Sequence, residues 1–305
     1  MSVLFDISSK IVLEGDSTEA LNYVFDSQDT DVVAAYSFRR LSPDYYGPLI
    51  KVRNKDLATE EDFYPLSNGK IDENELMSYL GDSQAFLVSF YNQAANAKTY
   101  NNPVNADGNA YTAGNSVQPR IVLNKTLNRT NGLISAPLSQ GTAIDYLQVN
   151  SASSNQITGD MFAYFVGAHD GTSGNNAMFS KRVDDSNKEY EFVYTSPTNV
   201  QYSDSNSSVD LPVSASNDLR IHSFNREKTT NTIDLQVNGT SLPSPGQISS
   251  DTINSTNSNL YIGARSDASY AFLGDFQELV IFDSYKSSAD KTAILNGVNK
   301  YYNVY

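Results

Sequence analysis

The stretch LRIHSFNREKTTNTIDLQVNGT (219–240) carries two strands and the tight turn that follows them. In its second half, the apolar residues Ile233 and Leu235 alternate with polar ones, which is the two-residue period of a half-buried strand. Asn238-Gly239 comes directly afterwards, and this pair favours the two-residue turn of a β-hairpin. The stretch therefore predicts antiparallel strands that turn one face toward a core.

The same pattern continues on both sides of this stretch. Apolar or alternating runs follow one another, with turn-forming residues between them. MFAYFVGA (161–168) is apolar throughout, as expected for a strand buried on both faces. The sequence therefore predicts an all-β fold, a two-sheet antiparallel jelly-roll sandwich with a few short helices. Further strands are predicted at 32–38, 48–53, 85–91, 118–123, 189–195, 260–265 and 276–283.

Two segments are typical of helices. DENELMSYLG (72–81) has Asp72 to cap its first turn and Gly81 to end it. In SSADKTAILNGVNKYY (287–302), Ser288 is predicted to cap a helix that Ala289 and Asp290 open, and the apolar residues recur at helical spacing. The face that this second helix turns to the core is expected to contain Ile294, Val298 and Tyr301.

Composition narrows the range of partners and compartments. The net charge is −14 and the pI about 4.5, so the chain repels nucleic acid and anionic membranes, and neither is an expected partner. There is no cysteine, which excludes disulfides and cysteine-ligated metals. The first residues lack the pattern of a signal peptide, and no apolar run is long enough to span a membrane. These features favour a protein assembled in a cytoplasm.

Two stretches resemble known families. Three segments resemble the N-terminal part of the catalytic domain of α-L-arabinofuranosidase B: AAYSFRRLSPDYYGPLIKVR (34–53), AFLVSFYNQAANAKTY (85–100) and QPRIV (118–122). This part of the family also recurs in proteins of tailed phages and of marine bacteria. The C-terminal half resembles the laminin G-like, concanavalin A-like jelly roll. The resemblance covers about residues 31–305 and implies a twisted two-sheet sandwich whose members include glycosidases, lectins and virion modules.

Although the resembled family includes glycosidases, the carboxylates of this chain give an enzymatic role little support. A retaining glycosidase needs two carboxyl groups about 5 Å apart, one as nucleophile and one as acid/base. Asp267 lies loosely where the resemblance implies the acid/base, but no counterpart of the nucleophile stands out. Glu278 is expected to be a structural carboxylate bonded to arginine or backbone. The other carboxylates on strands or rims are Glu189, Glu191 and Asp275.

A loop motif of the family is also altered. Its pattern YDQSGNG appears here as YNQAANA (91–97), with Asn92 in place of aspartate and alanine in place of both glycines. Because glycine permits close backbone approach and positive φ, we expect this loop to depart from the shape it has in the enzymes. The chain is therefore predicted not to be an enzyme, and no catalytic residue is assigned.

Loop residues offer a binding site of a different kind. Sugar sites combine aromatic faces with amide and carboxylate groups, and the segment 99–115 contains both. The ligand-binding candidates there are Tyr100, Asn102, Asp107, Asn109 and Tyr111. The alternative interpretation of this segment is a solvated loop rich in turn-forming residues.

Two smaller possibilities concern metals and histidines. Calcium could be coordinated by Asp107 and Asn109 with loop carbonyls, although no EF-hand pattern is present. His169 and Asp170 end a buried strand, where they could touch a ligand or a metal. The alternative for this pair is that the two residues cap the loop that follows.

The sequence favours one function and leaves two alternatives open. Residues 1–30 are expected to form an arm that docks on a neighbouring subunit, or else a strand added to the sandwich edge, and 31–305 the jelly roll. The favoured function is a non-enzymatic structural protein on the surface of a tailed-phage virion, as a head fibre, capsid decoration or tail-associated subunit that could also serve adhesion. The alternatives are a lectin-like tail-fibre module for host glycans and an arabinofuranosidase-like glycosidase. The expected partners are other virion proteins, cell-surface glycans and further copies of this chain.

Overall fold

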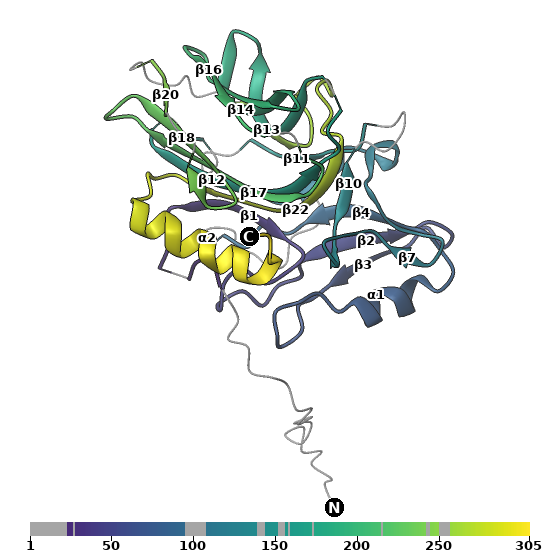
Figure 1. Ribbon diagram of the computed structural model, residues 1–305. Helices are drawn as coiled ribbons and strands as arrows, with labels where there is room; N and C mark the ends of the chain where they lie inside the picture. Colours follow the sequence, from purple (N-terminus) through teal and green to yellow (C-terminus); the bar gives the residue numbers. More distant parts are fainter. Residues whose placement is uncertain are drawn as a thin grey trace, which may run out of the picture.

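The computed structural model shows two large antiparallel sheets lying face to face, with the C-terminal helix on the outside of one of them (Figure 1). This arrangement confirms the prediction of an all-β sandwich. The structure describes residues 23–26, 28–94, 108–138, 144–151, 156–157, 159–172, 174–214, 216–241, 245–249 and 257–305.

One sheet has eight strands within the described residues, and its central strand is buried along its whole length. Two short strands, β10 (Ala136–Leu138) and β20 (Gly246–Gln247), pair with strands of the main series. The main series runs in the order β1 (Val32–Ser37), β22 (Gly274–Phe282), β12 (Met161–His169), β17 (Leu219–Glu227), β18 (Thr232–Val237) and β19 (Thr240–Ser241).

The other sheet has twelve strands in the described part of the chain. Two of the twelve are the short strands β6 (Arg120–Leu123), which pairs with β4, and β7 (Thr126–Leu127), which pairs with β6. In a separate small sheet, β8 (Arg129–Thr130) pairs with β9 (Leu133–Ile134). The main series runs in the order β16 (Ser208–Pro212), β15 (Asn199–Ser203), β14 (Asn187–Ser196), β13 (Asn176–Asp184), β21 (Leu260–Ile262), β11 (Leu147–Val149), β5 (Ala110–Tyr111), β4 (Ala85–Phe90), β2 (Ile50–Asn54) and β3 (Glu60–Phe63).

Aromatic side chains fill the space between the two sheets. Phe165 and Phe276 from the eight-stranded sheet and Phe90 from the twelve-stranded sheet form a contiguous series of ring contacts. Phe192 and Phe224 meet from opposite sheets with ring centroids 4.0 Å apart. Such large side chains bury much apolar surface, which is the main favourable contribution to folding.

The hairpin predicted at Asn238-Gly239 is confirmed. Both residues have positive φ, 53° and 73°, as the tight turn between β18 and β19 requires. β13 was not predicted from the sequence. Its second half contains Lys181 and Arg182, and register irregularities interrupt its pairing with β14, so no clean alternation is visible.

The two predicted helices are present as α1 (Glu73–Leu80) and α2 (Ser288–Tyr302). Asp72 caps α1 as predicted. The prediction for α2 was one residue out at its start, because Ser287 rather than Ser288 accepts the capping hydrogen bond from Asp290 N. The predicted face was also rotated, since the residues that α2 buries are Lys291, Leu295, Val298 and Tyr302. This stripe covers the outer face of the eight-stranded sheet.

The altered loop motif has a structural role in this chain. The Asn92 side chain accepts a hydrogen bond from Ala35 N at 2.9 Å and donates to Val33 O at 3.3 Å, so it pairs with the outer edge of β1. The Gln93 side chain accepts from Leu41 N and donates to Arg39 O. These bonds join the end of β4 to the other sheet. Residues 95–97 of the motif lie outside the described residues.

The described chain begins against the sandwich. Phe25 is buried in the cluster beneath α2, and Val24 N donates to Leu41 O. Residues 1–22 of the predicted arm lie outside the described residues. Neither described helix has the length and apolar character that crossing a bilayer would require.

Candidate functional site

One face of the twelve-stranded sheet points away from the core and is polar. Leu260 and Ile262 of β21 belong to the core cluster, so Tyr261 between them faces outward. Gln148 and Ser180 lie directly opposite Tyr261 on its two neighbouring strands. Glu191, on the next strand, lies opposite Ser180. These residues define the row from which the site is built.

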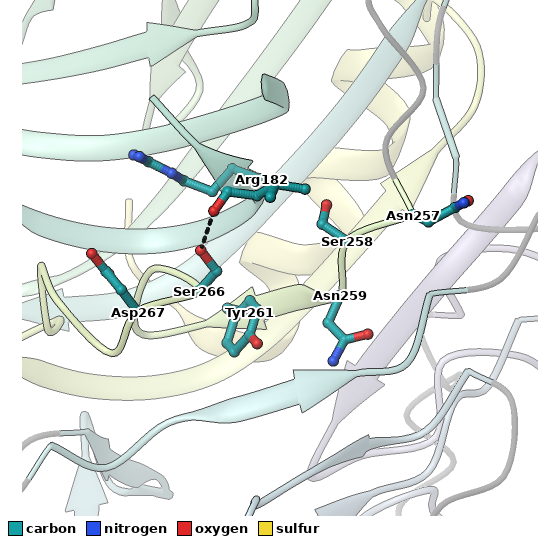
Figure 2. Close-up of a pocket in the computed structure, with 8 residues that line it drawn as sticks. Arg182, Asn257, Ser258, Asn259, Tyr261, Ser266 and Asp267 are labelled. Atoms are coloured by element: carbon teal, nitrogen blue, oxygen red, sulfur yellow. Dashed lines mark hydrogen bonds between the residues drawn. The ribbon is translucent and has the colours of Figure 1, made fainter. Parts of the chain in front are cut away.

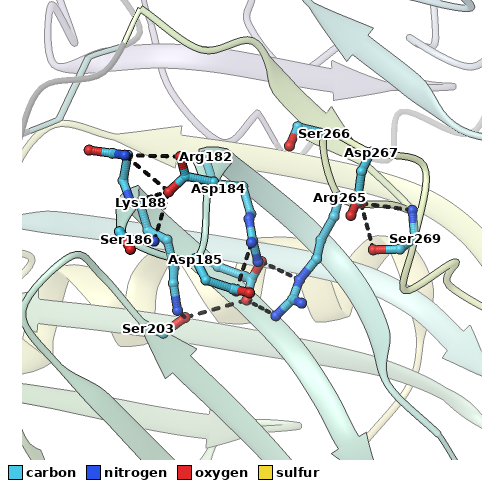
Figure 3. Close-up of polar contacts among 12 residues, drawn as sticks. Arg182, Asp184, Asp185, Ser186, Lys188, Ser203, Arg265, Ser266, Asp267 and Ser269 are labelled. Carbon is cyan, nitrogen blue, oxygen red and sulfur yellow. Dashed lines mark hydrogen bonds and ion pairs between the residues drawn. The ribbon is translucent and has the colours of Figure 1, made fainter.

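Glu191 is buried at the centre of an ion-pair cluster. Figure 3 shows the other members of this cluster, Arg182, Arg265 and Asp185. The Arg265 guanidinium contacts Glu191 at two points, Nε to Oε2 at 2.7 Å and Nη2 to Oε1 at 2.5 Å. Arg182 Nη1 approaches Oε2 at 3.1 Å, and Arg182 Nη2 pairs with Asp185 at 2.7 Å. Burial alone would lower the pKa of Arg182, but its hydrogen bonds to Glu191 and Asp185 outweigh that effect and raise it.

The loop after β21 is held in a strained conformation beside this cluster. Ala268 and Tyr270 both have left-handed backbones, with φ of 57° and 54°. The Arg265 guanidinium lies 3.3 Å from the centroid of the Tyr270 ring, and Tyr270 O accepts from Ala177 N. Strain of this kind persists only where neighbours enforce it, and it is enriched at functional sites.

A pocket of about 360 Å³ opens between this loop and the end of β13 (Figure 2). Ser266 closes one side, and its hydroxyl donates to Val183 O at 3.2 Å. The volume lies within the range usual for small-ligand sites. The lining residues are Arg182, Val183, Asn257, Ser258, Asn259, Tyr261, Ser266 and Asp267.

Asp267 is the exposed carboxylate of the pocket. Its Oδ1 accepts hydrogen bonds from Ser269 Oγ and Ser269 N, and these bonds hold the pKa of Asp267 below its usual value. The side chain is therefore ionised at neutral pH. A general acid in a glycosidase needs a raised pKa instead, usually produced by an apolar environment.

The remaining candidate carboxylates are engaged in hydrogen bonds or ion pairs within the protein. Glu278 lies beneath α2, where it pairs with Arg39 at 2.9 Å and accepts from the Tyr164 and Tyr302 hydroxyls. Its predicted structural role is thus supported by its contacts. Glu189 accepts from Ile157 N, and Asp275 from the Asn128 side chain.

The loop residues predicted as ligand contacts fall into two groups. Tyr100, Asn102 and Asp107 lie outside the described residues. Asn109 is buried, and its side-chain oxygen accepts from Asn92 N at 3.0 Å. Tyr111 lies on the polar face, directly opposite Gln148. Ligand binding by these residues stays a prediction.

The predicted calcium site cannot be assembled from the described residues alone, because Asp107 is not among them. Asn109, the other predicted ligand, is engaged with the Asn92 backbone. Among the residues that the structure describes, no group of three or more histidine, aspartate or glutamate side chains is arranged to hold a metal ion.

His169 and Asp170 lie at the end of β12, in a different part of the sandwich from the pocket. Asp170 Oδ1 accepts from the backbone and hydroxyl of Thr172, and His169 Nδ1 accepts from Gly171 N. These contacts cap the loop that follows β12, and contact of the pair with a ligand or a metal stays a prediction.

The His169 ring is packed between the sheets. It stacks on Tyr194 with a centroid separation of 4.4 Å, and the Tyr194 hydroxyl in turn meets Nε2 of His222. Burial lowers the pKa of both histidines, that of His222 to about 3. Both rings are therefore neutral in the folded protein at neutral pH.

Sequence reasoning identified Asp267 but missed the rest of the pocket. Tyr261 could have been found from the alternation in LYIGAR, which places it opposite to the core residues Leu260 and Ile262. Arg182 could not, because it comes from the unpredicted strand β13 and is brought to Asp267 only by sheet pairing.

No protein-family model matches the chain, and no curated protein matches its sequence. Solved structures do match. An arabinofuranosidase complexed with arabinofuranosyl-α-1,2-xylobiose aligns with a TM-score of 0.64 at 14% identity, over 89% of this chain and 63% of that one. A GH54 α-L-arabinofuranosidase soaked with a cyclic sulfate inhibitor aligns with a TM-score of 0.58 at 15% identity, with the same coverage. The chain thus shares the fold of these enzymes and spans less than two thirds of their length.

Proposed function

We propose that this protein is a non-enzymatic carbohydrate-binding protein of a tailed-phage virion, and that it holds a glycan in the pocket beside Tyr261. The observation that carries the proposal is the lining of this pocket. An aromatic ring, amide and hydroxyl groups and one ionised carboxylate converge on a cavity large enough for a sugar residue. Amides and carboxylates bond to sugar hydroxyls, while the ring packs against the apolar face of the sugar.

The carboxylates around the pocket support binding without catalysis. Glu191 is buried beside the pocket residue Arg182 and is paired with two guanidinium groups, those of Arg182 and Arg265. Asp267 has a lowered pKa and is unsuited to donate a proton at neutral pH. A retaining mechanism needs a nucleophile and a protonated acid, and among the described residues that line the pocket Asp267 is the single carboxylate, which supports binding over catalysis.

The virion location is supported by the sequence alone. The segments 34–53, 85–100 and 118–122 resemble a pattern found in tailed-phage proteins. The chain also carries no cysteine, which suits assembly in a reducing cytoplasm. On this proposal the jelly roll is displayed at the particle surface, and the part of the predicted arm that precedes Phe25 attaches it to neighbouring virion proteins, since Phe25 itself packs beneath α2.

Binding and catalysis can be separated in one experiment. The full chain and its Tyr261→Ala variant would be applied to a glycan array, and both would be incubated with 4-nitrophenyl α-L-arabinofuranoside. The proposal expects array binding that the substitution removes, and no release of nitrophenol. Release of nitrophenol that Asp267→Asn abolishes would replace the proposal with the glycosidase alternative.

The virion location needs its own measurement. Mass spectrometry of density-purified particles of the phage that encodes the chain should detect it at a fixed ratio to the capsid protein. Its presence only in the soluble part of the lysate would contradict the virion role while leaving glycan binding intact.

A further inference from the structure

A row of uncharged side chains extends from the pocket across the polar face. Tyr261, Gln148 and Tyr111 stand directly opposite one another on the adjacent strands β21, β11 and β5. Tyr146 lies beside Tyr261, with ring centroids 5.9 Å apart. All four are half-buried, and we call them the tyrosine platform.

Hydrogen bonds fix the platform in place. Gln148 Nε2 donates to the Tyr111 hydroxyl at 2.7 Å, and that hydroxyl donates to Asn150 Oδ1 at 2.7 Å. The polar edge of Tyr111 is thereby satisfied within the protein. Rings whose orientation is already fixed lose little conformational freedom when a ligand packs on them.

The platform is neutral although the chain is strongly acidic. None of its four side chains is charged, whereas the net charge of the protein is −14. An anionic polymer would gain no ion pair on the platform and would be repelled by the protein as a whole. Tyrosine rings and an amide instead suit the C–H faces and hydroxyls of uncharged sugars.

The length of the surface indicates more than one sugar residue. The step from β21 to β5 is two strand spacings, or about 10 Å. Tyr261 belongs both to the platform and to the pocket, so the two surfaces are continuous. A ligand confined to the pocket would leave Tyr111 untouched.

We propose that the pocket and the tyrosine platform together bind an internal stretch of a linear, uncharged polysaccharide. One sugar residue occupies the pocket, and its neighbours along the polymer lie over Tyr261, Tyr146 and Tyr111. This inference rests on the proposed carbohydrate-binding function and specifies the class of glycan that the site takes.

The test uses polymers first and oligosaccharides second. Migration of the full chain would be compared in native gels containing β-1,4-mannan, β-1,4-xylan, β-1,3-glucan, alginate or polygalacturonate. For any neutral polymer that retards the protein, calorimetry would follow with its oligosaccharides of one to six units. The variants are Tyr111→Ala, Tyr111→Phe and, as a control on another surface, Tyr285→Ala.

We expect retardation by a neutral polymer and an affinity that rises with oligosaccharide length. Tyr111→Ala should weaken binding of the hexasaccharide about tenfold and leave the monosaccharide unaffected, while Tyr111→Phe retains the ring and most of the affinity. Equal affinity for monosaccharide and hexasaccharide would overturn the extended site but keep the pocket. Retardation by the anionic polymers alone would contradict the proposal that the bound polysaccharide is uncharged. Absence of binding to every polymer, together with a blank glycan array, would overturn the proposed function itself.

Discussion

The Arg265 guanidinium meets the Glu191 carboxylate at two points, 2.7 Å and 2.5 Å, although the residues are 74 positions apart in the chain. This pair joins β14 to the loop after β21, and Arg182 of β13 approaches the same carboxylate. The loop that carries Asp267 is therefore tied to the sheet through one buried negative charge.

Removal of that charge should destabilise the protein strongly. Glu191→Gln leaves two guanidinium groups near a neutral amide, and we expect a loss of about 3–5 kcal/mol in the free energy of unfolding. Urea denaturation followed by circular dichroism measures it. Asp185→Asn is the matched control, because its side chain is 82% exposed and its pair with Arg182 should contribute less than about 1 kcal/mol. Equal losses in the two variants would contradict the central role of Glu191.

Asp267→Asn should affect binding rather than stability. The exposed carboxylate accepts charge-assisted hydrogen bonds, so its replacement is expected to weaken glycan affinity about tenfold. The melting temperature should fall only slightly, because asparagine keeps the side-chain oxygen that accepts from Ser269 N. Asp26→Asn provides the control, since Asp26 is also exposed and accepts a similar backbone hydrogen bond from Gln28 N, but it does not line the pocket. A variant that binds as tightly as the native chain would show that Asp267 does not contact the ligand.

Stability should fall as the pH is lowered through the range in which histidine titrates. The pKa of His222 is about 3 in the folded protein against 6.5 unfolded, because burial disfavours the charged ring. The free energy of unfolding is therefore highest above pH 6.5, where the ring is neutral in both states. It decreases progressively as the pH falls toward 3. At pH 5 the expected loss is about 2 kcal/mol from His222 alone. His169, whose pKa is also lowered, acts in the same direction.

Urea denaturation between pH 8 and pH 5 isolates this effect. Aspartates with a lowered pKa, such as Asp31 and Asp267, begin to lose their contribution only below about pH 4. Asp283, whose pKa is raised, acts with the opposite sign. The variant His222→Asn should flatten the pH dependence, and an unchanged slope would contradict the assignment to His222.

Asn92→Ala should loosen the connection between the two sheets. The substitution leaves Ala35 N without its hydrogen-bond acceptor inside the protein, which costs about 1–3 kcal/mol. Thermal denaturation should register the loss. Asn115→Ala, at an exposed position, should change the melting temperature little. The same melting temperature for both variants would show that the hydrogen bonds between Asn92 and β1 do not stabilise the protein.

Some strands, helices and turns could be predicted from their own residues, because a single interaction determines the sequence pattern of each. Strand β18 alternates because one face meets the core, α1 begins at a capping aspartate, and Asn238-Gly239 accepts the positive φ of a tight turn. These signals depend on neighbours within a few residues. The all-β sandwich could therefore be predicted before any contact was known.

The site depended on contacts between distant segments. Asp267 could be identified as a candidate carboxylate, but its lowered pKa comes from the conformation of its own loop, which Arg265 and Tyr270 hold in place. Tyr111, Gln148 and Tyr261 form one surface only because three strands pair in a particular register. The sequence by itself determined which segments become strands and which face of each is apolar. Tertiary structure decided which polar residues meet, because strand order and register are set by packing of the whole sandwich and leave no signal in any single segment.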